Sequence, residues 1–100
     1  MIMLEYLKEF NFKEEEIDCI LKSNDLNIIK NLELMKKNVK EVINYLCDLG
    51  VENVYNIFEN RIDLFLLPLS LIKQNFTKLD KDMLVHLLNN SISDLINYNI

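Results

Sequence analysis

Few side chains in this sequence could do chemistry, and the histidine is the first of them to consider. The one histidine, His86, has Asp82 one helical turn before it and Asn90 one turn after it. A carboxylate at this spacing could orient the imidazole ring, and a His–Asp pair could supply half of a metal site on one helix face. A single histidine without a second group of ligands completes neither site. We therefore expect His86 to lie at the surface and to pair with Asp82.

The cysteines and the acidic triplet give no reactive site either. Cys19 and Cys47 belong to no CxxC or Cys/His set, which favours reduced, partly buried thiols. Glu14, Glu15 and Glu16 fall at an expected helix start, where negative charge suits the helix dipole. The single glycine cannot form a phosphate-binding loop, and the carboxylates are not paired at apolar positions. The sequence predicts a protein that is not an enzyme and that uses no cofactor or metal.

A group of lysines could contact a large partner. Residues 22–40 hold five lysines and two acidic residues, whereas the whole chain has a net charge of −5. The lysine patch consists of Lys30, Lys36, Lys37 and Lys40. Together with Lys73, it could contact the phosphate groups of a nucleic acid, although the overall negative charge disfavours that partner. The alternative is a solvated helix face on which Glu33 and Lys37 form an ion pair.

The elements that must position these residues are helices. Half of the residues are hydrophobic, none of them is alanine, and the chain has one glycine and one proline. This composition excludes disordered, collagen-like and hairpin-rich chains. Large apolar residues recur at helical spacing, and no strand-like alternation accompanies them. The clearest pattern predicts one helix over 32–49, which ends at Gly50.

Polar residues and Pro68 mark the other helix boundaries. Ser70 is expected to cap a helix at 71–76, Asp80 to cap one at 81–90, and Ser93 or Asp94 to open a terminal helix. Pro68 should interrupt the chain between the short turn at 63–67 and the helix after it. Further helices are predicted at 2–10, 13–22 and 52–60.

The helical pattern recurs, which predicts how the helices are arranged. A helix, a tight turn, a shorter helix and a brief apolar turn repeat about three times, over roughly 3–30, 32–69 and 70–100. Helical repeats of this length are typical of α-solenoids. The predicted fold is all-α. It is a single helical domain over 1–100, a short α-solenoid-like stack of about three helical repeat units with six to eight helices.

The best repeat copy resembles a known family. It comprises 43–51, ending in Leu49-Gly50-Val51, then Val54 and Ile57-Phe58, and then the leucine-rich run 64–71. This unit is similar to the repeat of the mitochondrial transcription termination factor (mTERF) family, most clearly over 43–72. The resemblance implies a curved stack of helix triplets and nucleic-acid binding along a basic concave face. The chain departs from that pattern in its net charge of −5 and its single arginine.

The last residues of the sequence are unusually apolar. A possible interaction surface consists of Leu95, Ile96, Tyr98 and Ile100. An exposed cluster of this kind would make a dimer or bind a protein partner. The alternative is that the terminal helix folds back over the run 64–72 and closes the core.

Two functions follow from the sequence. The first is a non-catalytic small helical module that binds a macromolecular partner, through protein–protein interaction or self-association. The second is an mTERF-like nucleic-acid-binding protein that uses the lysine patch. The start of the sequence has no secretory signal pattern, and the longest apolar run is about half of what a membrane span requires. The sequence therefore predicts a cytoplasmic protein with no membrane association.

Overall fold

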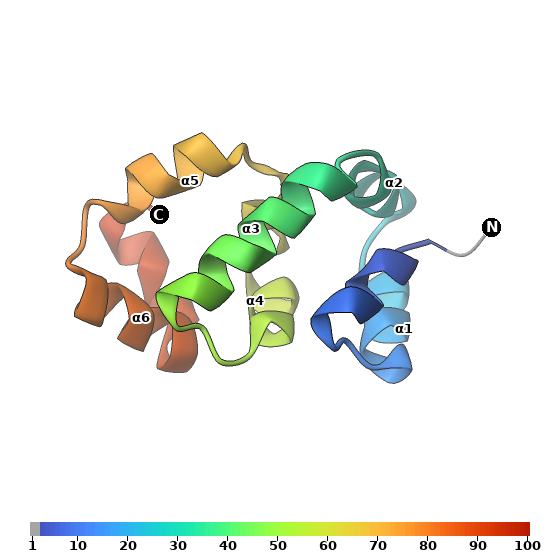
Figure 1. The fold of residues 1–100 in the computed structure, drawn as a ribbon, viewed down its shortest axis with the longest axis horizontal. Coiled ribbons are helices and arrows are strands. Elements are labelled where there is room, and N and C mark those ends of the chain that lie inside the picture. The colour runs from blue at the N-terminus through green and yellow to red at the C-terminus, as the bar shows by residue number, and fades with distance from the viewer. Residues whose placement is uncertain (1–2) are drawn as a thin grey trace.

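Helices follow one another along residues 3–100, the part of the chain described by the computed structural model (Figure 1). Residues 1 and 2, the start of the predicted 2–10 helix and 1–100 domain, lie outside the described residues. No strand occurs over 3–100, so the predicted all-α fold is confirmed. The α-helices are α1 (Glu14–Ser23), α2 (Leu26–Leu34), α3 (Lys36–Leu49), α4 (Val54–Asn60), α5 (Leu69–Phe76) and α6 (Lys81–Asn90). The 3-10 helices are η1 (Glu5–Phe10), η2 (Ile62–Leu66) and η3 (Ile92–Tyr98).

The longest helix, α3, forms the centre of the fold. It lies between the α1–α2 end and the α5–α6 end of an elongated molecule that measures 41 × 22 × 22 Å (Figure 1). The apolar positions of α3 recur at helical spacing and are buried, and α3 contacts α2, α4, α5 and η2. Its buried residues are Val39, Val42, Ile43 and Leu46. Because α3 contacts elements on both sides of it, it joins the two ends into one core.

Gly50 ends α3 as the sequence predicts. Its φ of 114° lies in the left-handed region that favours glycine. The backbone N–H of Val51 donates to the Leu46 carbonyl at 3.0 Å, which closes the helix end. Asn89 of α6 fixes the following turn, because its amide donates to the Gly50 carbonyl at 3.1 Å and accepts from the Glu52 N–H at 2.9 Å.

Pro68 interrupts the chain between η2 and α5, also as predicted. Asn38 of α3 holds both sides of the proline, because its amide donates to the Leu67 carbonyl at 2.6 Å and accepts from the Leu69 N–H at 3.3 Å. The predicted cap at Ser70 is wrong, since α5 begins at Leu69 and Pro68 occupies the capping position. Proline presets φ for a helix start and leaves no N–H of its own to satisfy.

The predicted single helix over 32–49 is wrong. The chain turns at Met35 (φ −98°, ψ 22°), which ends α2 and begins α3. The turn lets α2 pack against η2 as well as α3, and so buries Ile29 and Leu32. Asp25 caps α2, since its carboxylate accepts from the Ile28 N–H at 3.0 Å.

The predicted start of α6 is confirmed, whereas the predicted start of the terminal helix is wrong. Asp80 caps α6 as predicted, accepting from the Met83 N–H at 2.9 Å. The predicted opening of the terminal helix at Ser93 or Asp94 is wrong, because η3 begins at Ile92 as a 3-10 helix. No helix over 3–100 is both long and apolar enough to cross a membrane.

The described helices enclose one core without buried polar side chains. Core residues come from all nine helices of residues 3–100, and no polar or charged residue of this range is buried. The predicted repeats stay a prediction, since the helices at equivalent positions differ in kind: η1 is a six-residue 3-10 helix, whereas α3 has 14 residues.

Candidate functional site

His86 does not form the pair that the sequence predicts. It is exposed on α6, and its Nδ1 lies 3.4 Å from the side-chain nitrogen of Asn90, which also donates to the His86 carbonyl at 3.2 Å. No ion pair joins it to Asp82 among the described residues, so the predicted pairing is wrong. Within residues 3–100, no group of three or more histidine, cysteine or acidic residues could hold a metal ion.

The cysteines are free but more exposed than predicted. Cys19 and Cys47 are both exposed, so the expected partial burial is wrong. Desolvation and then the charge of Asp48 raise the pKa of the Cys47 thiol, which makes it less reactive. Desolvation, followed by a hydrogen bond with Cys19 and the charge of Glu59, raises the pKa of Tyr55 to about 12. The raised pKa values keep the Cys47 thiol and the Tyr55 hydroxyl protonated at neutral pH.

The predicted lysine patch is only partly available to a partner. Lys30 on α2 and Lys36 and Lys37 on the first turn of α3 are exposed. Lys40 is half-buried, forms an ion pair with Glu9 at 2.9 Å, and lies 5.9 Å from the centre of the Tyr6 ring.

The alternative interpretation of this patch also needs correction. The expected Glu33–Lys37 ion pair does not form, because the turn at Met35 changes the helical spacing between these two residues. Glu33 instead accepts a hydrogen bond from the Leu4 N–H at 2.8 Å, and thereby ties the start of the described chain to α2.

The apolar residues at the end of the sequence divide between core and surface. Leu95 is 0% exposed, so its assignment to an interaction surface is wrong. Ile96 is 71% exposed and Tyr98 36% exposed, whereas Ile100 is half-buried and its carbonyl accepts from Arg61 at 2.8 Å. Side chains three residues apart lie on one face of a 3-10 helix, so Ile92 is buried beside Leu95. This face packs on α6 and α4, and the apolar surface left at η3 is small.

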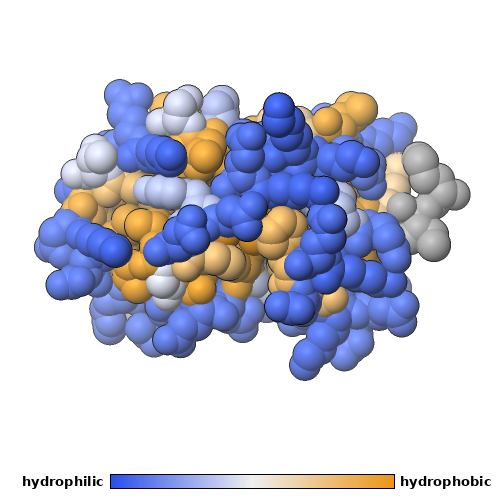
Figure 2. All heavy atoms as spheres, viewed as in Figure 1, coloured by the Kyte–Doolittle hydropathy of each residue, from blue (hydrophilic) through white to orange (hydrophobic). Residues whose placement is uncertain are grey.

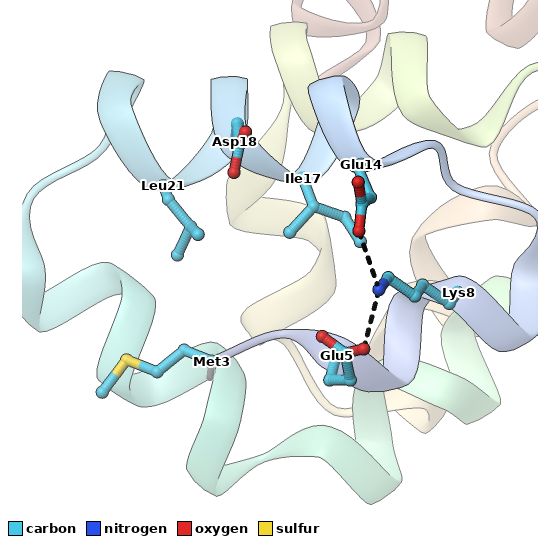
Figure 3. A pocket seen from close by; sticks show the side chains of 7 residues that line it. All are labelled: Met3, Glu5, Lys8, Glu14, Ile17, Asp18 and Leu21. Carbon is cyan, nitrogen blue, oxygen red and sulfur yellow. Dashed lines mark hydrogen bonds and ion pairs between the residues drawn. The ribbon is translucent and has the colours of Figure 1, made fainter. Parts of the chain in front are cut away.

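In a pocket between η1 and α1, the one lysine is already paired with carboxylates of the protein. It has a volume of about 230 Å³, and Lys8 lies between two carboxylates within it (Figure 3). The Lys8 Nζ is 2.8 Å from Glu5 and 3.4 Å from Glu14, and the hydrogen bond to Glu5 is the largest cause of its raised pKa. The two carboxylates already pair with the only cation of the lining, so the pocket offers no free cation to an anionic ligand.

An apolar groove between α3, α5 and α6 is the strongest candidate site. Its volume is about 230 Å³. Figure 2 shows hydrophobic surface over the half of the molecule that carries these helices. The lining consists of Tyr45, Leu49, Lys73, Phe76, Thr77, Leu79, Lys81 and Leu84. Tyr45 and Phe76 stack with their ring centres 6.1 Å apart, so two aromatic rings stabilise one wall of the groove.

The only charges in the groove lining are positive. The Lys73 Nζ lies 5.4 Å from the centre of the Tyr45 ring, and Lys81 stands at the start of α6. Neither lysine forms an ion pair with a carboxylate of residues 3–100. Acidic residues adjoin the lining in sequence, at Asp48, Asp80 and Asp82, but none of them lines the groove.

The sequence did not predict this groove, although it named one of its residues. Lys73 was expected to support the lysine patch, but it lies on α5 and faces the groove. The lining comes from three helices and the α5–α6 turn, spread over residues 45–84. Taken alone, each helix has the pattern of an ordinary amphipathic segment. The one feature of the sequence that could have indicated an accessible apolar site is its excess of large apolar side chains for a chain of this size.

Comparison of the chain with protein-family models, with curated proteins and with solved structures finds no match in any of the three. The resemblance of 43–72 to the mTERF repeat therefore stays a prediction.

Proposed function

We propose that this protein is a non-catalytic helical module that binds a protein partner through the groove between α3, α5 and α6. The observation that carries the proposal is the half-exposed apolar lining of the groove, to which Tyr45, Leu49 and Leu79 contribute. Apolar side chains that the fold leaves accessible in a concave site gain free energy when a partner covers them.

The size of the groove favours a protein side chain over a small ligand. Pockets for small molecules and cofactors occupy about 300–1,000 Å³, and this groove has about 230 Å³. Such a volume suits one or two bulky side chains, which act as anchors at the centre of many protein interfaces. A catalytic role has no support, because His86 and both cysteines lie outside the groove lining.

The second candidate function is nucleic-acid binding through the lysine patch. The exposure of Lys30, Lys36 and Lys37 on adjoining helices favours it. The engagement of Lys40 with Glu9 and the net charge of −5 weigh against it. Fluorescence anisotropy with labelled RNA and DNA at several salt concentrations tests this candidate, since phosphate contacts weaken steeply with salt. Absence of binding at low salt would exclude it.

Quantitative co-purification from the native cell tests the proposed function. Leu79→Asp places a carboxylate in the groove, and Leu71→Asp makes the same change on α5 outside the lining, at a side chain that is exposed. We expect a set of proteins to be retained by the wild type and by Leu71→Asp and to be lost with Leu79→Asp. Circular dichroism checks that both variants are folded. Equal retention by all three proteins would contradict the proposal.

A further inference from the structure

The charge of the groove indicates which partners it can accept. Its lining holds two cations and no carboxylate, although the protein as a whole has a net charge of −5. Lys73 stands on α5 and Lys81 at the start of α6. The net charge of −5 attracts a basic partner to the molecule as a whole, but the groove lining offers such a partner no carboxylate with which to pair. An acidic partner can pair with both lysines once it is docked.

The backbone around the groove indicates the conformation of the partner. The groove is lined by three helices and by the turn between α5 and α6, and residues 3–100 contain no strand edge. The backbone N–H groups of Thr77 and Leu79 in that turn already donate to the carbonyls of Gln74 and Phe76. An extended peptide would therefore find no row of backbone partners and would leave its own backbone groups unpaired against an apolar wall. A helix satisfies its own backbone and can place apolar side chains on one face.

We propose that the groove between α3, α5 and α6 binds an acidic amphipathic helix of the partner protein. One or two bulky apolar side chains of that helix fill the space between Leu49, Leu79 and Leu84, and its flanking carboxylates pair with Lys73 and Lys81. This inference rests on the proposed function, because it specifies the partner of the same groove.

The test is a selection of binders from a random 16-residue peptide library displayed against the purified full chain. We expect the enriched peptides to have a net negative charge and apolar residues at i, i+3 or i+4, and i+7. The strongest binder is then synthesised and measured by anisotropy. The double variant Lys73→Glu/Lys81→Glu should weaken its binding at least tenfold. The matched control is Lys30→Glu/Lys37→Glu, which changes the net charge equally but lies on α2 and α3 outside the groove. It should have a much smaller effect.

The outcomes separate this inference from the proposed function. Enriched peptides that are neutral or basic, or equal weakening by the two double variants, would overturn the acidic helix. If Leu79→Asp abolishes binding while Lys73→Glu/Lys81→Glu does not, the groove binds proteins but the inference about charge is wrong. If no groove variant affects binding, both proposals fail. A wild-type dimer in light scattering that Leu79→Asp converts to a monomer would show that a second copy of this chain occupies the groove, and would also overturn the inference.

Discussion

Two asparagines make the same pair of hydrogen bonds, one at the turn that contains Pro68 and one at the turn that contains Gly50. Asn38 bridges the residues on both sides of Pro68, and Asn89 bridges Gly50 and Glu52. In each case one amide donates to a backbone carbonyl and accepts from a backbone N–H two residues further on. The glycine and the proline set the local backbone geometry, and the asparagines hold each turn against a helix that is distant in sequence.

The Asn38 bridge gives a prediction at the residue scale. Asn38→Ala leaves the Leu67 carbonyl and the Leu69 N–H without their partner, both in a half-buried setting. We expect the free energy of unfolding to fall by about 1–3 kcal/mol. Asn44→Ala on the exposed side of the same helix is the control and should change it by less than about 0.5 kcal/mol. Urea unfolding followed by circular dichroism measures both. Equal values for the two variants would show that the bridge contributes nothing.

The half-buried phenol of Tyr6 predicts an alkaline limit to stability. Its hydroxyl donates to the Leu32 carbonyl at 2.8 Å, and burial followed by the charge of Glu33 raises its pKa above the usual value of 10.0. As the pH rises above 10, the unfolded chain loses this proton while the folded protein keeps it. The folded state therefore loses stability, by at most about 1.4 kcal/mol per pH unit.

Tyr6→Phe removes this titration and also the hydrogen bond. At pH 7 we expect the variant to be less stable than the wild type by about 1 kcal/mol. The difference should shrink as the pH rises from 9 to 11, because only the wild type carries the Tyr6 proton. Chemical unfolding at each pH measures this difference. A constant difference over that range would contradict the assigned burial of the phenol.

At the scale of elements, the sequence predicted helices well where the chain itself supplies the boundary. Gly50 ends α3, Pro68 separates η2 from α5, and Asp80 caps α6, each as expected. The turn at Met35 was missed because no glycine, proline or capping side chain marks it. Tertiary packing sets that boundary, because the turn lets α2 bury Ile29 and Leu32 against α3 and η2. The spacing of apolar residues along one helix does not indicate which other helices it contacts.

In the terminal helix η3, packing also decides which apolar side chains are buried, and this gives a prediction at the element scale. Leu95 is 0% exposed and its sequence neighbour Ile96 is 71% exposed. Leu95→Ala should lower the free energy of unfolding by about 2–5 kcal/mol, because it removes buried methyl groups and leaves a cavity. Ile96→Ala should change it by less than about 0.5 kcal/mol. Thermal and urea unfolding measure both. Similar small effects would mean that η3 is not part of the core.

At the scale of the whole molecule, the candidate site could not be found from the sequence. Closeness along the chain pointed instead to the lysine patch of Lys30, Lys36, Lys37 and Lys40. The groove gathers side chains from three helices and the α5–α6 turn over residues 45–84, and its two lysines are eight residues apart. Its charge is opposite in sign to that of the whole chain. The fold places α5, α6 and the end of α3 at the same end of the molecule (Figure 1), and this arrangement brings Lys73 and Lys81 beside the apolar side chains of the groove.

The shape of the molecule also changes the expectation about its ends. The apolar terminal residues were expected to form an interaction surface, but η3 buries Ile92 and Leu95 against the rest of the fold. Of the residues predicted for that surface, Ile96 is the most exposed. A single exposed side chain is common on protein surfaces. The groove between α3, α5 and α6 is concave, and its lining combines half-exposed apolar side chains with two lysines that form no ion pair among the described residues, which is why we place partner binding there.

Photo-crosslinking inside the native cell tests that placement most directly. A photoreactive amino acid is placed in turn at Lys73 and Leu79 in the groove, at Lys36 in the lysine patch, and at Glu15 on α1. We predict that both groove positions crosslink to the same partner protein and that Lys36 and Glu15 crosslink to it much less. Equal yields at all four positions would contradict the account. So would a dominant crosslink at Lys36 that nuclease treatment removes.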